Sequence, residues 1–146
     1  MSGVSGFQLR TLVPADYDRV IALWRDTEGM GLGASDTREA VEAFLLRNPG
    51  LSRVAEDART GELAGAVLCG HDGRRGYLHH LAVAKPLRGR GLGRWLAEAC
   101  LAELGALGLE KCTIFLFADN EAGMSFWRHA GWKARTDLVV VQKTLA

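Results

Sequence analysis

The sequence predicts a mixed α/β fold, in which strands and helices alternate along a chain of 146 residues. Some segments repeat apolar residues every three to four positions, which predicts helices that are buried on one face. Other segments alternate or run apolar between glycine and proline, which predicts strands. The composition, with 48% hydrophobic and 24% charged residues, is typical of a folded globular protein. The length suits one domain, so we expect a single domain over residues 1–146.

Six segments have strand character. The step Asp72-Gly73 between the third and fourth of them is typical of a hairpin turn. The fifth is wholly apolar except for its threonine and is predicted to be buried. The sixth would offer an edge that could pair in a homodimer. In order, the predicted strands cover residues 7–12, 51–57, 62–70, 77–83, 113–117 and 138–145.

Four segments have helical character. Pro14 suits the first turn of the first helix. Ser35 or Asp36 is expected to cap the second helix, because a short polar side chain there can accept from a free backbone N–H. A long helix follows the glycine-rich loop and ends at Gly108, and a short one covers residues 121–130.

Charge and cysteine content exclude several classes of protein. Lys and Arg total 18 against 17 Asp and Glu, a net charge of +1, so we expect no nucleic-acid partner. The three cysteines form no CxxC pair, which argues against a zinc site or a redox dithiol. The start lacks a signal-peptide pattern, and no apolar run is long enough to span a bilayer. We therefore expect a cytoplasmic protein without a membrane partner.

The most informative stretch is the loop between the strand at 77–83 and the long helix. Residues 84–97 contain no acidic side chain, and glycines let backbone N–H groups approach an anion closely. A helix N-terminus adds free N–H donors, so the loop predicts a phosphate-bearing ligand. A GxxxxGK[S/T] loop is absent, and the dinucleotide pattern GxGxxG fails at Leu96. The basic residues and glycines of the loop are Lys85, Arg88, Gly89, Arg90, Gly91, Gly93 and Arg94.

The string Arg88-x-x-Gly91-x-Gly93 resembles the [Q/R]xxGx[G/A] motif of the GNAT superfamily of acetyl-CoA-dependent N-acyltransferases. Residues 80–93 look like the central strand and pyrophosphate loop of that family. Residues 120–132 are similar to its second motif, NxxAxxFYxxxGF. The pattern at 70–76 looks most like the YpeA-type bacterial acetyltransferases.

The resemblance implies a mixed, mostly antiparallel central sheet with splayed fourth and fifth strands, flanked by helices. It also implies an N-acetyltransferase that binds acetyl-CoA and no metal, and in which a primary amine attacks directly in a ternary complex. The acceptor could be a small metabolite, an amino acid or a protein N-terminus. The N–H of Leu81 would stabilise the developing oxyanion. The residues that would contact the cosubstrate are Leu81, Ala82, Val83, Arg88, Gly89, Arg90, Gly91, Leu92, Gly93, Arg94, Asn120 and Trp127.

A base must deprotonate the amine, and His79 is the candidate, because related arylalkylamine acetyltransferases have a histidine at this point of an HxHxLAV strand. Regular alternation would put Tyr77, His79, Leu81 and Val83 on one face and His80 on the other, where a structural role is expected. Glu28, in the loop after the first helix, is a second candidate.

Trp127 stands where the family commonly has a tyrosine that protonates the leaving thiolate. An indole N–H donates a hydrogen bond but is no acid near neutral pH. Ser125 or Tyr77 could assist, or Trp127 could pack against the cofactor and the core. The alternative function is therefore a non-catalytic acyl-CoA-binding module.

Overall fold

The computed structural model describes residues 3–146. The start of the chain, where no targeting segment is expected, includes residues 1–2, which lie outside this range. The chain divides into two compact units, one up to Phe115 and one from Leu116 to Ala146. The single domain over residues 1–146 stays a prediction. Among the described residues, no helix has both the length and the apolar character needed to cross a membrane.

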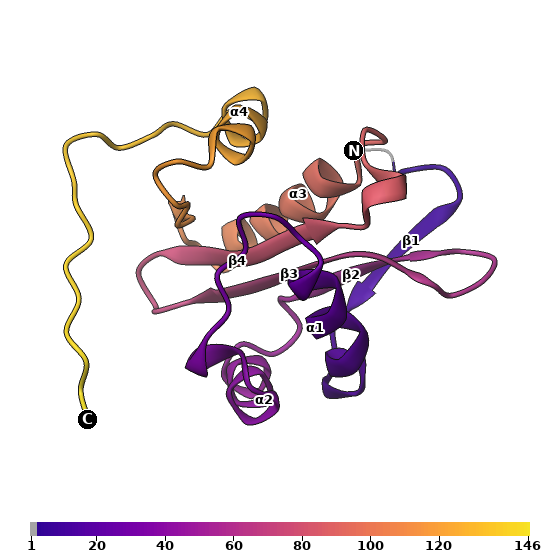
Figure 1. Cartoon of the computed structure of the whole chain (residues 1–146), viewed down its shortest axis with the longest axis horizontal. Coiled ribbons are helices and arrows are strands. Elements are labelled where there is room, and N and C mark those ends of the chain that lie inside the picture. The colour runs from indigo at the N-terminus through magenta and orange to yellow at the C-terminus, as the bar shows by residue number, and fades with distance from the viewer. Residues whose placement is uncertain (1–2) are drawn as a thin grey trace. The chain divides into compact units, whose positions relative to one another are not determined.

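The first unit is built on a five-stranded sheet in the order β1-β2-β3-β4-β5 (Figure 1). The first four strands pair antiparallel, and β5 pairs parallel with the start of β4. This β4–β5 pairing covers only Gly76 with Cys112 and Tyr77 with Thr113, so the rest of β4 has no partner on that side within the described residues. The strands are β1 (Phe7–Thr11), β2 (Arg53–Asp57), β3 (Leu63–His71), β4 (Gly76–Val83) and β5 (Cys112–Thr113).

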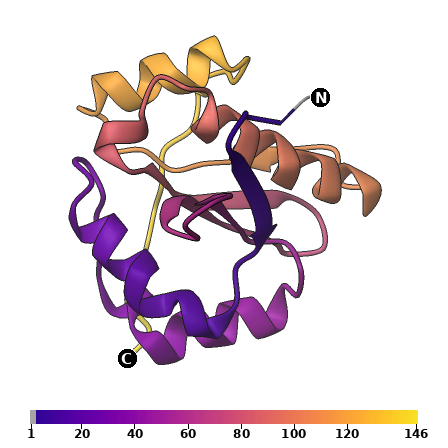
Figure 2. The same cartoon turned by 90° about the vertical axis from the view of Figure 1, so that its right-hand side faces the viewer.

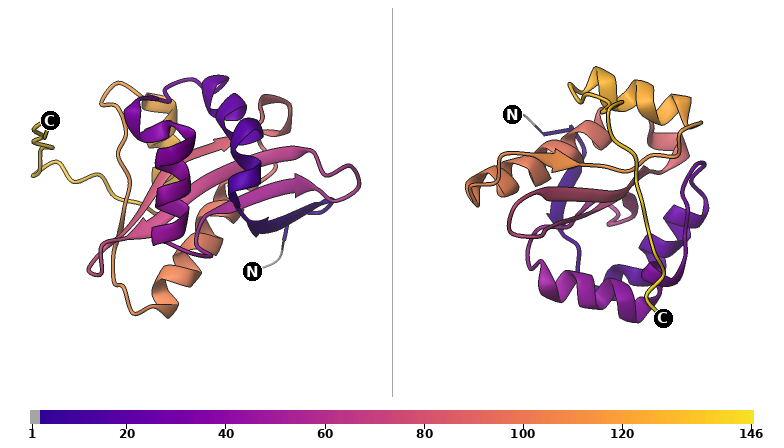
Figure 3. Two further views of the ribbon diagram at one scale, coloured as in Figure 1. Left: turned by 90° about the horizontal axis from the view of Figure 1, so that it is seen from below. Right: turned by 90° about the vertical axis from the view of Figure 1, so that its left-hand side faces the viewer.

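Helices cover both faces of this sheet (Figures 1 and 2). The left view of Figure 3 shows α1 (Tyr17–Arg25) and α2 (Arg38–Arg47) lying across one face. The long helix α3 (Leu92–Ala106) packs on the other. Two glycines of β3 allow this close packing: a Cβ at Gly70 would lie 2.7 Å from Phe44 of α2, and one at Gly65 would lie 2.9 Å from Leu96 of α3.

The core between the sheet and the first two helices is apolar and buried. Trp24 and Val20 are fully buried, and removing such side chains from water is the main stabilising contribution to the fold. The members of this core are Leu12, Val20, Ile21, Trp24, Val41, Val54, Ala66, Leu68 and Ala82.

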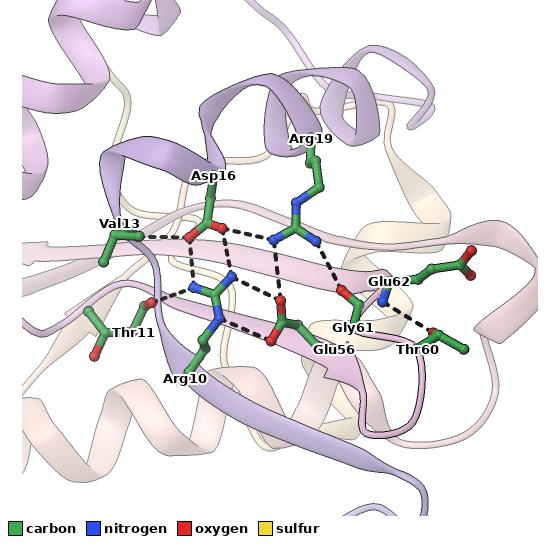
Figure 4. A network of polar contacts seen from close by, with 9 residues as sticks. All are labelled: Arg10, Thr11, Val13, Asp16, Arg19, Glu56, Thr60, Gly61 and Glu62. Atoms are coloured by element: carbon green, nitrogen blue, oxygen red, sulfur yellow. Dashed lines mark hydrogen bonds and ion pairs between the residues drawn. The ribbon is translucent and has the colours of Figure 1, made fainter.

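A cluster of four charges joins β1, β2 and the start of α1 (Figure 4). Asp16, which is buried, accepts from Arg10 at 2.6 Å and from Arg19 at 2.9 Å. Glu56 accepts from the same two arginines at 2.9 and 3.2 Å. Each carboxylate is thus shared by both guanidinium groups, which ties the first strand and helix to the second strand.

The second unit contains α4 (Glu121–His129) and the chain that follows it (Figure 1). Asn120 caps α4, because its side-chain oxygen accepts from the Gly123 N–H at 2.9 Å. Trp127 is 6% exposed and packs edge-on against Phe126 and Trp132, with ring centroids 5.0 and 4.8 Å apart.

Three expectations about elements are wrong. The cap of α2 is Thr37, which accepts from the Ala40 N–H, because residues 34–36 form a separate 3-10 turn, η2 (Ala34–Asp36). The strand predicted at 113–117 stops at Thr113, and Phe115 and Phe117 are each 58% exposed. Residues 138–145 form no strand in the described structure. Strand propensity reflects packing and pairing with a neighbour, so an apolar run without a paired strand does not form one.

Candidate functional site

A β-bulge lies in the middle of β4. Ala66 of β3 pairs with Ala82, and Leu68 pairs with His79, so the single residue between them on β3 faces two residues on β4, His80 and Leu81. His80 has a φ of 55°, a left-handed conformation that is uncommon for a residue other than glycine and costs about 1–2 kcal/mol. A bulge leaves backbone groups outside the ladder of hydrogen bonds, here at the centre of a strand.

The bulge turns His80 toward α1 and α2. Its Nε2 lies 2.8 Å from Oδ1 of Asp36 in η2, and its ring centroid lies 4.9 Å from that of Trp24 in α1. The expectation that His80 points to the opposite face from His79 is therefore wrong. The extra residue of the bulge shifts the alternation, so Ala82, too, joins the core under α1 and α2.

His79 lies in a row of rings on the same side of the sheet. Its ring meets Phe44 of α2 edge-on at 5.9 Å and stacks on Tyr77 at 6.2 Å. Tyr77 in turn stacks on Phe115 at 6.2 Å. Burial is the main cause that lowers the pKa of His79, and the charge of His80 adds to it. His79 therefore favours the neutral form.

The loop after β4 forms a set of backbone donors at the start of α3. Gly89 and Gly91 have φ values of 83° and 85°, which glycine adopts without strain. No side chain caps α3, and its first backbone hydrogen bond runs from Trp95 to Gly91. The N–H groups of residues 89–94 find no acceptor among the described residues. This cradle fits a phosphate or pyrophosphate group.

Two basic side chains of the loop are paired with the loop after α1. Glu28 lies 3.0 Å from Nζ of Lys85 and 3.2 Å from Nη1 of Arg88. Arg88 also donates from Nε to the carbonyl of Val83 at 3.0 Å. Hydrogen bonds from Lys85 and Arg88 lower the pKa of Glu28 to about 2. Such a weakly basic carboxylate is poorly suited to take a proton from an amine.

The other two arginines of the loop differ from each other. Arg94 pairs with Glu98, one turn further along α3, at 2.8 Å. Arg90 is exposed and forms no ion pair with any described residue. Of the basic residues at the cradle, Arg90 is thus the one whose charge is not balanced by a carboxylate.

Two predicted contact residues, Asn120 and Trp127, belong to the second unit. The side-chain oxygen of Asn120 is used in the cap of α4, which leaves its amide nitrogen for other contacts. Trp127 is buried among aromatic rings of its own unit.

Neither a metal site nor a cysteine nucleophile is supported in the part of the chain that the structure describes. No group of three or more His, Cys, Asp or Glu side chains there could hold a metal ion. The three cysteines are unpaired. Burial raises the pKa of Cys112 to about 12, so its thiol is not a nucleophile near neutral pH.

The cradle fits a phosphate-bearing ligand, and comparison with known sequences gives the class of protein. Residues 17–132 match the model of the acetyltransferase (GNAT) family, and the chain belongs to that family. An acetyltransferase of Sodalis glossinidius is 29% identical over 138 residues, which cover 94% of this chain and 95% of the relative. An acetyltransferase of Photorhabdus laumondii is 32% identical over 115 residues, which cover 79% and 78% of the two chains.

Solved structures share the fold at low sequence identity. Ard1 from Thermoplasma volcanium superposes with a TM-score of 0.75 at 17% identity, covering 86% of this chain and 82% of that one. The PaiA N-acetyltransferase from Thermoplasma acidophilum, solved in complex with coenzyme A, gives a TM-score of 0.75 at 17% identity over 92% of each chain. The expected fold is confirmed: it is a mixed, mostly antiparallel central sheet with splayed fourth and fifth strands, and helices flank the sheet.

Sequence reasoning missed two residues that the structure places beside His80. Asp36 was expected only as a candidate cap of the second helix, and Trp24 is a member of the buried core. Asp36 lies 44 positions before His80, and a separation of this length gives no sequence pattern from which their contact could be predicted. The two histidines in succession on a predicted strand were the available hint, because a bulge can turn both to one face.

Proposed function

We propose that this chain is an acetyl-CoA-dependent N-acetyltransferase that transfers an acetyl group to a primary amine by direct attack in a ternary complex. The observation that carries this proposal is a pair of features, one in the middle of β4 and one in the loop that follows it. The bulge at His80 and Leu81 is followed, within ten residues, by a cradle of free N–H groups. Membership in the acetyltransferase family supports the same reaction.

The cradle would hold the pyrophosphate of the cosubstrate. Backbone N–H groups of residues 89–94 and the guanidinium of Arg90 would contact the phosphate oxygens. The free edge of β4 beyond Tyr77 would offer the backbone of residues 81–83 to the pantetheine arm. When bound, acetyl-CoA supplies the acetyl group as an activated thioester.

Leu81 and a nearby base would do the chemistry on the protein side. Leu81 belongs to the bulge, and its N–H would donate to the oxygen that gains negative charge as the amine attacks. A base must also take a proton from the ammonium, because only the neutral amine is a nucleophile. The candidates are the two histidines of β4, which lie on the side of α1 and α2. His79 would line the space in which the amine binds.

A two-stage experiment tests this function. A thermal shift with CoA and with acetyl-CoA comes first; ligand at a hundred times its dissociation constant adds about 2.7 kcal/mol of stability. CoA release is then measured with a polyamine, an aromatic amine, a free amino acid and a short peptide with a free N-terminus. Without a thermal shift, the assignment to acetyl-CoA chemistry is wrong.

Trp127→Tyr is the matched variant for the second stage, since it restores the hydroxyl that the family commonly has. Turnover by the natural chain supports an enzyme in which Trp127 is sufficient. Turnover by Trp127→Tyr but not by the natural chain shows that the natural chain lacks the general acid that protonates the leaving thiolate. If both bind CoA and neither releases it with any amine, the non-catalytic binding module is the better description.

A further inference from the structure

The hydrogen bond between His80 and Asp36 fixes which ring nitrogen of His80 can accept a proton. A carboxylate only accepts hydrogen bonds, so Nε2 of His80, 2.8 Å from Oδ1 of Asp36, carries the hydrogen. Nδ1 of the neutral ring is then the atom with a free lone pair. No described residue hydrogen-bonds to it, and the side chain is 19% exposed. The basic nitrogen is therefore not used by the fold.

Asp36 is itself held in place. Its Oδ2 accepts from the Gly33 N–H at 2.9 Å, and its backbone carbonyl accepts from the Tyr17 hydroxyl at 2.6 Å. The side chain is only 7% exposed. A carboxylate that is buried and fixed at this distance stabilises a positive charge on the imidazole more strongly than one in water would.

Trp24 adds a second, independent observation. Its ring packs on His80 and is fully buried, and its Nε1–H is a buried donor without an acceptor among the described residues. Buried donors are nearly always hydrogen-bonded, so an unpaired one marks a polar spot in the core beside His80. His80 thus has an acceptor atom, Nδ1, that the described residues leave without a partner, and it lies next to this buried donor.

We propose that His80, oriented by Asp36, is the catalytic base that takes the proton from the acceptor amine. This assignment rests on the proposed acetyltransferase function and deepens it. The ammonium gives one proton to Nδ1 of His80, and the imidazolium that results is paired with Asp36. The amine nitrogen then bonds to the acetyl carbon while the bond from that carbon to sulfur breaks. A second amine proton ends on the CoA sulfur, and His80 returns its proton to water.

His79 is less suited to this step. Its ring lies between Phe44 and Tyr77, and it forms no hydrogen bond with any described residue. The charge of Asp36 acts on His79 only at a distance, without the hydrogen bond that Asp36 makes to His80. His79 would line the amine site, while His80 accepts the proton.

The charged and titratable groups around His80 come from three elements. Asp36 faces it from η2, and the hydroxyl of Tyr17 in α1 donates to the backbone carbonyl of Asp36. His79 adjoins it on β4, and Trp24 of α1 covers its ring without titrating. These are the groups whose charge or contacts bear on a proton held by His80.

His80→Gly is the variant that tests the proposal, since glycine adopts a φ of 55° without strain and leaves a space for added imidazole. The matched variant is His79→Gly on the same strand, and His129→Gln, on the exposed side of α4, is the control. All are assayed with the amine that the natural chain acetylates fastest. We expect kcat/KM of His80→Gly to fall about 100-fold at pH 7 and to recover at least tenfold with imidazole. Imidazole should not rescue His79→Gly.

Asp36→Asn tests the positioning role of Asp36. The amide can keep a hydrogen bond to the ring, but it carries no charge to stabilise the imidazolium. We expect kcat to fall about tenfold and the acidic limb of the kcat/KM profile to move to lower pH. A residue that only held the fold together would lower the rate without moving this limb.

Each outcome decides between the two proposals. Binding of CoA to His80→Gly as tight as to the natural chain, with activity lost and rescued, supports the assignment. Activity within threefold of the natural chain, or a loss that imidazole does not restore, overturns it and leaves the acetyltransferase function standing. A natural chain that binds CoA but acetylates no amine overturns both the enzyme function and the role of His80.

Discussion

Oε2 of Glu28 lies 3.2 Å from Nη1 of Arg88, and this contact joins the loop after α1 to the first residue of the glycine-rich motif. The other oxygen of Glu28 contacts Lys85, whose pKa is raised mainly by that hydrogen bond. One carboxylate thus pairs with two basic residues of the glycine-rich loop, one of which, Arg88, is a predicted contact of the cosubstrate. A bound phosphate would compete with Glu28 for them.

Glu28→Gln should therefore tighten CoA binding. An exposed ion pair contributes little in water and is screened by salt, so we expect the dissociation constant to fall by a few fold at low salt, and less at high salt. Isothermal titration calorimetry measures this directly. Glu62→Gln, at an exposed residue without an ion pair among the described residues, should leave it unchanged. Weaker binding by Glu28→Gln would mean that Glu28 instead orients Arg88 for its ligand.

Arg90→Ala should weaken CoA binding more than Arg88→Ala does. Arg90 has no carboxylate partner among the described residues and is free to contact phosphate, whereas Arg88 must first leave Glu28. A charge-assisted hydrogen bond contributes about 1.5–3 kcal/mol, so we expect at least a tenfold loss of affinity for Arg90→Ala. Titrations at two salt concentrations check the electrostatic origin. Equal losses for Arg74→Ala, in the β3–β4 hairpin, would point to a nonspecific charge effect.

Asp16→Asn should lower the free energy of unfolding by about 2–3 kcal/mol at pH 7, because it removes the charged acceptor that Arg10 and Arg19 share. Burial alone would raise the pKa of Asp16, but hydrogen bonds from Arg10, the Val13 N–H and Arg19 lower it from 3.8 to about 2. Its contribution is thus fully present above pH 4 and is lost as the pH falls through about 2.

Denaturant unfolding at pH 7 and pH 2.5 measures this dependence. The difference between the natural chain and Asp16→Asn should shrink at the lower pH, since the natural carboxyl starts to be protonated there. Asp119→Asn is the control, because Asp119 is exposed and makes no ion pair with a described residue. A difference that stays constant with pH would contradict a charge-based role for Asp16.

The bulge itself can be tested by stability. At a φ of 55°, glycine avoids the strain that alanine feels, so His80→Gly should be more stable than His80→Ala by about 1 kcal/mol. At His79 we expect the opposite order, because glycine there only adds freedom to the unfolded chain. His79→Gly should be less stable than His79→Ala by about 0.5–1 kcal/mol. Thermal unfolding of the four variants checks this. The same order at both positions would argue against the bulge.

Local patterns predicted most of the elements that carry the site. The segments at 7–12, 51–57, 62–70 and 77–83 are strands in the structure, with ends shifted by up to two residues. The strand–loop–helix order around Gly91 is also as expected, and it rests on glycine, arginine and apolar periodicity within twenty residues. These signals are local, and so they can be identified without knowing what packs against them.

Features that depend on a partner strand or a distant loop could not be predicted in this way. The strand at 113–117 shrinks to Cys112–Thr113, because β4 and β5 pair only at their first residues. Likewise, the face of His80 depends on one extra residue opposite Val67, which no pattern of apolar residues marks.

By itself the sequence determined the family, the order of the elements up to the short helix α4 and the anion-binding loop, since each follows from residues close together in the chain. The tertiary structure alone decided which side chains meet there. It paired Glu28 with Arg88 across 60 positions and Asp36 with His80 across 44. Both contacts require the segment between α1 and α2 to fold back over β4. The position of this segment is set by the burial of the apolar core beneath α1 and α2. Residues from many parts of the chain contribute to that core.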